Sequence, residues 1–449
     1  MRFLYLLLIV GLSWVSSEAA EGADWRFGIA QREITPSGSI WMAGFASRDR
    51  PSQGVLQPLW AKALVLEDGQ GTRAAIVTMD LIGVDRGLSE TVCRRVLPAT
   101  GIPRQRILLN SSHTHSGPVV AGVTPLVYDL DADQQAAVAA YAKTLEDRLV
   151  EVIEAAAKDL RPGTLAFGEG ECKFAANRRA MRILANTPDA QPPAPVDHGV
   201  PVLVIRGEDD SLRGVLFGYA CHNTTLAIFQ INGDYAGFAQ AALEEKHPGA
   251  TALFMIGCGA DCNPHPRSEV ELARQHGQSL ATAVEAVLEG AVEPVRGPLE
   301  VAFEEVELKL VDPPGKEELE RLADDKNVYQ QRRAKSFLGA LAAGRSLPAS
   351  CRCPVQVIRL GNDLVMAALG GEVCVDYALR LRREFAGQRI WIAGYSNDVF
   401  AYVPTERVLE EGGYEGGEAM VYFGLPGPFQ SGLEQQLIDT VKRLAASAP

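Results

Sequence analysis

Several short runs along this chain are apolar throughout and are bounded by polar or turn-forming residues. Apolar runs of this length, without regular polar alternation, are typical of β-strands that are covered on both faces. The runs that predict strands are 64–66, 74–77, 107–109, 202–205, 215–217, 252–256, 357–360, 364–367 and 389–392, of which 357–360 and 389–392 each include one arginine.

Between these runs, apolar residues recur at helical spacing. Strand and helix patterns therefore mix throughout, which predicts an α/β chain with mixed β-sheets flanked by helices. The Pro-rich stretch 188–195 reads as a surface loop or hinge, and strand patterns resume directly after it, so it marks no firm domain boundary. The predicted helices are 134–158, 236–246, 269–289, 315–342, 373–385 and 430–446.

The N-terminus has the layout of a secretory signal peptide. Arg2 precedes an apolar run from Phe3 to Val15, and small residues follow up to Ala20. The run is too short to remain as a bilayer-spanning anchor, although an N-terminal anchor is the alternative. We therefore expect cleavage of residues 1–20 and export of residues 21–449 to the periplasm, the cell surface or the medium.

Charge and cysteine content narrow the function classes. A formal charge of −13 opposes binding to nucleic acid, so we expect no nucleic-acid partner. An oxidising destination favours disulfides among the eight cysteines, although their pairing cannot be deduced from sequence. A four-cysteine zinc site is disfavoured because the chain has no pair of C-x-x-C motifs.

Three histidines follow predicted strands. His113 and His115 come after the run 107–109, and they would share one face if that strand continued. His222 follows the run 215–217 in a similar setting. Imidazoles at the ends of two strands suit a shared metal site. The alternative is a set of hydrogen-bonded polar histidines on loops.

Two further strand ends carry candidate groups. Glu372 follows the run 364–367 after two glycines, where a carboxylate could bind a metal or could cap the next helix. The loop 257–264 follows the run 252–256 and contains Cys262. This thiol could be a nucleophile, half of a disulfide or an inert small side chain.

Four segments, in their order along the chain, resemble the neutral (non-lysosomal) ceramidase family. They are the segments that contain His113 and His115, His222, the loop 257–264 and Glu372. Segments 33–36 and 42–45, together with Asp80, are also similar to that family, and the resemblance covers roughly residues 27–445. It implies one neutral ceramidase-like zinc hydrolase domain over 21–449, with the zinc site at strand ends. The family's C-terminal immunoglobulin-like domain has no counterpart before Pro449.

The resemblance also implies residue roles. It implies one Zn²⁺ per chain and a lipid-like substrate, with peripheral membrane contact left open. The implied zinc ligands are His113, His222, Glu372 and Tyr402; the implied catalytic residues are His115, Cys262, Asp261 and Arg178; the implied substrate-binding residues are Asn177, Arg178, Asp234 and Tyr414.

One departure concerns the family's nucleophilic serine, which lies in a G-D-V-S-P-N loop. Here the loop reads Gly259-Ala260-Asp261-Cys262-Asn263-Pro264. If the two loops are aligned on Gly259, Cys262 takes the place of the serine. If they are aligned on Asp261 and Pro264, Asn263 takes it. The expected activity is zinc-dependent hydrolysis of an N-acyl amide, with ceramide giving a sphingoid base and a fatty acid. The alternatives are hydrolysis of another N-acyl or ester substrate, a non-catalytic lipid-binding homologue, and a disulfide-held structural protein.

Overall fold

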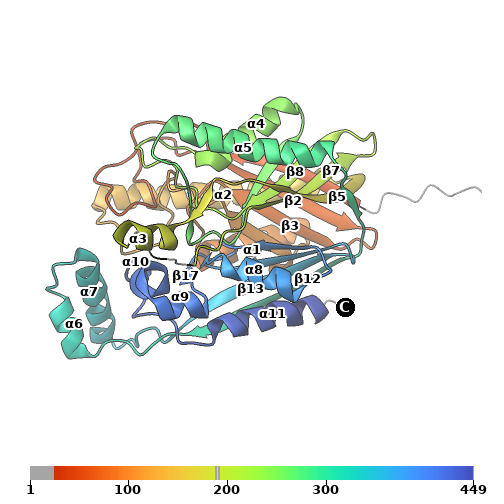
Figure 1. Ribbon diagram of the computed structural model, residues 1–449. Coiled ribbons are helices and arrows are strands. Elements are labelled where there is room, and N and C mark those ends of the chain that lie inside the picture. Colours follow the sequence, from red (N-terminus) through yellow and green to blue (C-terminus); the bar gives the residue numbers. More distant parts are fainter. Residues whose placement is uncertain (1–24, 188–189, 191–192, 448–449) are drawn as a thin grey trace, which may run out of the picture.

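The computed structural model describes residues 25–187, 190 and 193–447 (Figure 1). The predicted signal peptide, residues 1–20, lies outside the described residues. Part of the Pro-rich stretch 188–195 also lies outside them. No helix of the described part is both long and apolar enough to cross a bilayer.

Two larger sheets dominate the described residues. The strand order is β4-β3-β2-β1-β5-β7-β8-β9 in the first, with β11 paired to β5, and β12-β13-β14-β16 in the second. The first contains β1 (Trp25–Glu33), β2 (Trp60–Asp68), β3 (Arg73–Met79), β4 (Ile107–Ser111), β5 (Arg161–Glu171), β7 (Gly199–Gly207), β8 (Leu212–Tyr219), β9 (Thr251–Ile256) and β11 (Glu293–Val295). The second contains β12 (Leu299–Lys309), β13 (Ser350–Leu360), β14 (Leu364–Leu369) and β16 (Ile390–Ala393).

Helices cover the outer faces of these sheets, so the order of layers is helix, sheet, sheet, helix (Figure 1). The larger sheet is covered by α1 (Arg86–Thr100), α2 (Ala132–Lys158), α4 (Asp234–Lys246) and α5 (Val270–Glu289). The smaller sheet is covered by α8 (Asp376–Glu384) and α11 (Leu433–Ser447). The remaining helices are η1 (Arg104–Arg106), α3 (Arg178–Asn186), α6 (Lys316–Leu322), α7 (Val328–Ala342), α9 (Glu406–Glu411), the π-helical η2 (Tyr414–Glu418) and α10 (Met420–Phe423).

Most of the apolar runs are buried on both faces, as predicted. In β2, Leu64 and Leu66 pack between the two sheets, whereas Ala63 and Val65 pack against the α1 and α2 layer. Trp391 of β16 fills the space between the sheets and is 1% exposed. Since successive side chains of a strand point to opposite faces, an unbroken apolar run is what this four-layer arrangement requires. The predicted α/β class is confirmed.

Some element boundaries differ from the prediction. The stretch 315–342 forms two helices, because the Asn327 side chain caps a new helix at α7. Strand β5 escaped prediction because its glycines interrupt the apolar pattern. A Cβ at Gly163 would lie 2.2 Å from the Arg206 carbonyl oxygen, so close strand packing requires the glycine.

All eight cysteines lie in the described part of the chain, and each is a free thiol. Seven are buried and Cys351 is partly exposed. The disulfides expected for an exported protein are therefore absent from this structure. Packing of the sheets and helices holds the fold.

Three helical crossovers join parallel strand pairs, namely β3–α1–β4, β8–α4–β9 and β14–α8–β16. A crossover of this kind leaves the carboxyl ends of both strands at the same edge of the sheet. Two further short strand pairs are present. Strands β15 (Glu372–Val373) and β17 (Tyr402–Val403) pair in parallel, and β6 (Ala175–Asn177) and β10 (Cys262–Pro264) pair antiparallel.

The buried side chain of Asn110 joins three of these strand ends. Its Oδ1 accepts a hydrogen bond from the Ile256 N–H of β9 at 3.0 Å. Its Nδ2 donates to the Gly394 carbonyl after β16 at 2.8 Å and to the Ser396 hydroxyl at 3.1 Å. The outermost strands of the larger sheet, β4 and β9, are thereby connected to each other and to the smaller sheet.

We expect Asn110→Ala to lower the free energy of unfolding by about 2–4 kcal/mol, because it leaves the buried Ile256 N–H unpaired and removes two further hydrogen bonds. Urea unfolding measures this loss. Asn186→Ala is the control, since the exposed Asn186 bonds only within its own helix and should change stability by less than about 0.5 kcal/mol. Equal effects of the two substitutions would contradict this role of Asn110.

Candidate functional site

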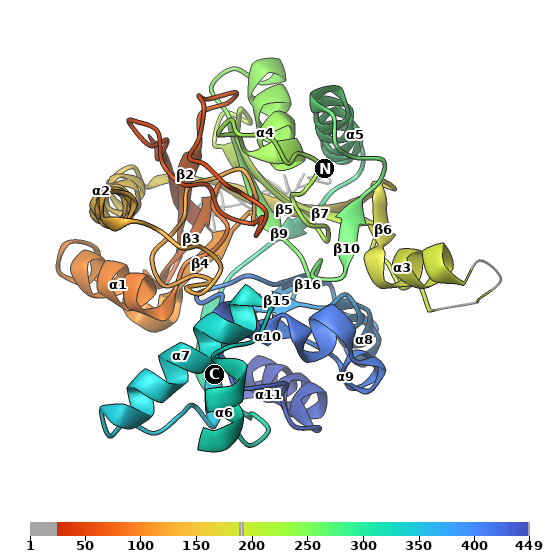
Figure 2. The ribbon, with the colours of Figure 1, turned by 90° about the vertical axis from the view of Figure 1, so that its left-hand side faces the viewer.

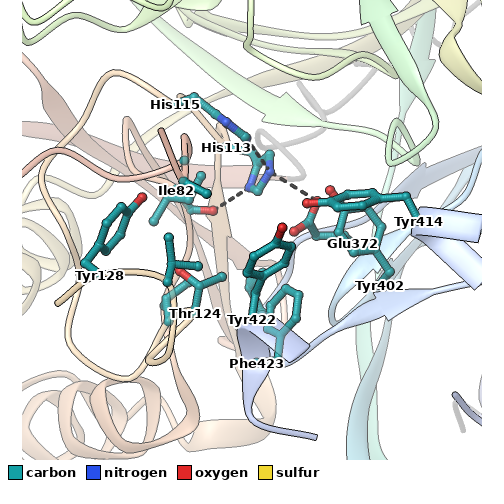
Figure 3. Close-up of a pocket in the computed structure, with 15 residues that line it drawn as sticks. Ile82, His113, His115, Thr124, Tyr128, Glu372, Tyr402, Tyr414, Tyr422 and Phe423 are labelled. Carbon is teal, nitrogen blue, oxygen red and sulfur yellow. Dashed lines mark hydrogen bonds and ion pairs between the residues drawn. The ribbon is translucent and has the colours of Figure 1, made fainter. Parts of the chain in front are cut away.

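His113 leaves the end of β4 in a left-handed backbone conformation, with φ of 61°. The strand stops at Ser111, so the two histidines do not lie on one face of a continued strand. A non-glycine residue in this region is strained and must be held by its surroundings. The Nδ1 atom of His113 lies 2.6 Å from the Ile82 carbonyl oxygen (Figure 3).

His222 is oriented in the same way after β8. Its Nδ1 lies 2.8 Å from the Gly259 carbonyl oxygen. A carbonyl only accepts hydrogen bonds, so Nδ1 carries the proton in both rings, and the neutral form of each ring has its lone pair on Nε2. Burial, followed by the nearby Arg178, lowers the pKa of His222 to about 4, which keeps this imidazole neutral. Such a backbone contact is how proteins orient histidines that bind metals.

Glu372 and Tyr402 lie side by side because β15 and β17 pair in parallel with these residues in register. Helix α8 begins at Asp376, so Glu372 does not cap it. The Oε2 atom of Glu372 lies 3.2 Å from His113 Nε2 and 3.3 Å from His222 Nε2. The predicted strand ends thus bring His113, His222 and Glu372 to one point.

These donor atoms fit a metal ion. Tetrahedral zinc with bonds of about 2.1 Å separates its ligand atoms by about 3.4 Å, close to the separations here. Glu372 Oε2 is buried and has no hydrogen-bond donor, although unpaired buried oxygens are rare. The ring atoms of His113, His115 and His222 that could bind a metal all lie within 4.8 Å of one another. His115 therefore belongs to the same cluster, with its Nε2 3.1 Å from that of His113.

Arg178 reaches this cluster from the first turn of α3. Its Nη1 lies 3.5 Å from His222 Nε2, and its Nη2 donates to the Tyr402 hydroxyl at 3.1 Å. The Nε group donates to Glu415 at 2.7 Å. Sequence reasoning missed Glu415, which is fully buried and also pairs with Arg179 at 2.8 Å. No local pattern marks it, apart from its position beside the candidate Tyr414.

Asn177 and Asp261 bond mainly to each other and to the backbone. The Asn177 Oδ1 caps α3, and its Nδ2 donates to Asp261 and to the Pro195 carbonyl. Asp261 also accepts from the Val375 N–H at 2.9 Å. Burial raises the pKa of Asp261 to about 6. This pair joins the start of α3 to the segment after Glu372, and neither residue lines the pocket described below.

Cys262 and Asn263 point in different directions from β10. The Cys262 side chain is fully buried in the apolar core under α4 and α5, with Sγ 3.9 Å from the Pro195 carbonyl oxygen. Burial, followed by the neighbouring Asp261, raises the pKa of the Cys262 thiol well above its usual value. Asn263 instead places its Oδ1 3.5 Å from Arg178 Nη1. Of the two positions, Asn263 is the one that faces the cluster.

Asp234 lies at the start of α4 and binds backbone groups. Its two oxygens accept from the Leu226 and Tyr235 N–H groups at 2.8 and 2.7 Å. The residue is fully buried and adopts φ of 52°. These contacts order the loop after His222, and Asp234 is not among the residues that line the pocket.

A pocket opens over the cluster, with aromatic and aliphatic walls (Figure 3). His113, His115 and Glu372 lie at one end of it, and Tyr402 and Tyr414 form the adjacent wall. The ring of Tyr414 lies 5.3 Å from that of Tyr402 and 5.5 Å from the Arg178 guanidinium, measured from ring centroids. An apolar pocket with a few convergent polar groups is the usual form of a small-molecule site.

Comparison with known proteins agrees with this geometry. The sequence model described as neutral/alkaline non-lysosomal ceramidase, N-terminal, matches residues 25–299. That range contains His113, His115, Arg178 and His222, whereas Glu372 and Tyr402 follow it. The neutral ceramidase of Pseudomonas aeruginosa is 25% identical over 97% of this chain and 74% of its own length. The neutral ceramidase of Mycobacterium tuberculosis is 25% identical over 84% of this chain and 71% of its own length.

The comparison with solved structures shows the same fold. The crystal structure of neutral ceramidase from Pseudomonas aeruginosa superposes with a TM-score of 0.73 at 23% identity, covering 95% of this chain and 75% of that chain. The family match spans more than half of the 449 residues, and the resemblance inferred from the strand-end motifs is confirmed. This chain belongs to the neutral/alkaline non-lysosomal ceramidase family.

Proposed function

We propose that this chain is a zinc-dependent hydrolase of N-acyl amides, with ceramide as the first candidate substrate. One observation carries the zinc proposal: two histidines with protonated Nδ1 atoms direct free Nε2 lone pairs at the unpaired Oε2 of Glu372. His113, His222 and Glu372 would hold one ion, with Tyr402 as a fourth ligand. Such an ion polarises the amide carbonyl and lowers the pKa of a water molecule toward about 7.

The residues of the chain then orient the substrate and handle protons. His115 lies next to His113 and is placed to take or return a proton as water adds to the acyl carbon. Arg178, held by Glu415, directs N–H groups at the cluster, where they would stabilise negative charge on the carbonyl oxygen. The C–N bond breaks, the acyl carbon keeps the hydroxyl group of water, and the leaving amine gains a proton.

Family membership supports the reaction class, and the pocket's apolar walls suit an acyl group. The alternative within the same class is another N-acyl or ester substrate, which the loop departure at Cys262 and Asn263 favours. Export of the mature chain remains part of this proposal, and it depends on residues 1–20, which lie outside the described residues.

Removal of the metal should abolish activity. We expect purified residues 21–449 to carry about one zinc per chain by mass spectrometry and to cleave a fluorescent short-chain ceramide until a chelator is added. His113→Ala should lose the zinc and at least about 100-fold in kcat/KM, because one ligand is missing. His265→Ala, which changes an exposed histidine, is the control and should retain both. Full hydrolysis by metal-free protein would reject the proposed mechanism.

Water rather than a thiol is the proposed nucleophile. Cys262 is buried in the core and does not line the pocket, so Cys262→Ala should keep kcat/KM within about threefold of the wild type. Asn263→Ala, next in sequence but facing Arg178, should lower kcat/KM more. A folded, zinc-loaded Cys262→Ala variant without turnover would instead identify the thiol as the nucleophile.

The charge of Glu415 is expected to position Arg178. Glu415→Gln keeps the shape of the side chain but removes the countercharge from a buried arginine. We expect a kcat/KM at least about tenfold lower and a lower melting temperature, since breaking a buried ion pair is costly. Glu411→Gln is the matched control, because Glu411 pairs with Arg179 nearer the surface. Unchanged kinetics in Glu415→Gln would show that Arg178 needs no such partner.

A further inference from the structure

His115 lies beyond the end of β4, so pairing within the sheet does not fix its direction. Its N–H donates to the Asn223 carbonyl at 3.1 Å, which holds one side of its backbone. The imidazole is less restrained: Nδ1 is buried without a hydrogen-bond partner, and Nε2 lies beside His113. Contacts from another part of the chain must therefore set where this ring points.

These contacts come from residues 43–48, in the long loop between β1 and β2 that is coloured red in Figure 2. The Ala43 N–H donates to the Gly117 carbonyl at 2.9 Å, so this loop runs beside the segment that carries His115. The ring of Phe45 meets that of His115 edge-on, with centroids 5.0 Å apart. Residues 43–48 thus contact both the ring of His115 and the backbone that follows it.

Gly44 leaves the space that the His115 ring occupies. A Cβ at Gly44 would lie 2.3 Å from Cγ of His115, far closer than two nonbonded carbons approach. The φ of Gly44 is 98°, a conformation that other residues adopt only with strain. A side chain at this position would displace the imidazole, so the close fit of the glycine backbone itself restrains the ring.

Arg48 holds the backbone of the same histidine. Its Nη2 donates to the His115 carbonyl at 2.9 Å, and its Nη1 donates to the Ile228 carbonyl at 2.8 Å. Ile228 belongs to the loop after β8, so one guanidinium connects the two loops that carry the clustered histidines. The guanidinium carbon also lies 5.4 and 5.3 Å from the ring centroids of Phe45 and Phe229, within the range of cation–π attraction.

This arginine is buried without a countercharge. It is 7% exposed, its Nε has no hydrogen-bond partner, and no carboxylate in the described part of the chain forms an ion pair with it. Burial lowers the pKa of Arg48 to about 10. Buried arginines are normally paired with carboxylates, so this arrangement costs stability, and such costs are found where function requires them.

We propose that Arg48, with Gly44 and Phe45, positions His115 for proton transfer, and that Arg48 affects the reaction only through this histidine. The inference rests on the proposed amide hydrolysis, in which His115 handles the proton. It assigns a role in the reaction to the loop between β1 and β2, which contains none of the candidate ligands or catalytic residues.

The test is a double-mutant cycle on the zinc-loaded protein with a short-chain ceramide. Arg48→Met should retain zinc, lower kcat at least about tenfold and leave KM within about threefold, because a displacement of about 1 Å in a reacting group is enough for such a loss. In a His115→Ala background, the same change should alter kcat less than about twofold. A role in stability alone would lower kcat by the same factor in both backgrounds.

Further variants provide a second route and a control. Arg48→Lys keeps the charge and one donor, so it should lose less activity than Arg48→Met. Phe45→Ala changes a partly exposed residue, should fold even if Arg48→Met does not, and should lower kcat at least about threefold. Arg50→Met is the matched control, because Arg50 stacks on the same Phe229 ring at 4.4 Å but is half exposed, and it should keep wild-type kinetics.

Nuclear magnetic resonance of isotope-labelled histidines tests the positioning without turnover. The ring signals that vanish in His115→Ala identify His115. Arg48→Met should move or broaden these signals and leave those of His276, which stacks on Phe174, unchanged. Unchanged His115 signals, or equal losses of kcat in both backgrounds, would overturn the inference and leave amide hydrolysis intact. Hydrolysis of no N-acyl amide by zinc-loaded wild-type protein would instead overturn the proposed function and the inference with it.

Discussion

The arrangement of the site depends on one buried amide, that of Asn110. The strands β4 and β9 lie at opposite ends of the order of the larger sheet, and β16 belongs to the other sheet. The Asn110 side chain bonds to β9 and to the turn after β16, so three strand ends meet at one point. A backbone N–H such as that of Ile256 must find a partner when buried, and the Asn110 side chain supplies it. The candidate ligands follow strands that converge in this way.

Backbone carbonyls then orient the chemistry. His113 donates from Nδ1 to the Ile82 carbonyl oxygen, and His222 donates from Nδ1 to the Gly259 carbonyl oxygen. Both rings therefore direct Nε2 toward Glu372. The carboxylate is in turn set by the pairing of β15 with β17, which also fixes the neighbouring Tyr402. The cost of gathering these polar groups in the interior is offset by bonds to the backbone and by the countercharge of Glu415 on Arg178.

Part of the pocket wall is supported by an element that lies outside the cluster. Helix α7 contributes none of the candidate ligands, yet Tyr329 and Arg332 support the wall opposite the histidines. In this view the two-sheet core holds the reactive groups rigidly, while the loop around Thr124 and the short α10 set the space available. These two segments are bonded to each other through the Leu126 N–H and the Tyr422 carbonyl.

The sequence by itself determined the α/β class, because continuous apolar runs indicate strands that are buried on both faces. It also marked four site residues, because polar groups directly after such runs fall at strand ends: His113, His115, His222 and Glu372. Its resemblance to the ceramidase family pointed to Tyr402 and Arg178. Only the tertiary structure decided that Cys262 faces the core while Asn263 faces Arg178, that Asp234 serves its own loop, and that Glu415 pairs with Arg178. The physical reason is that side-chain direction and partnership across more than two hundred residues depend on how strands pair and helices pack, which no local pattern encodes.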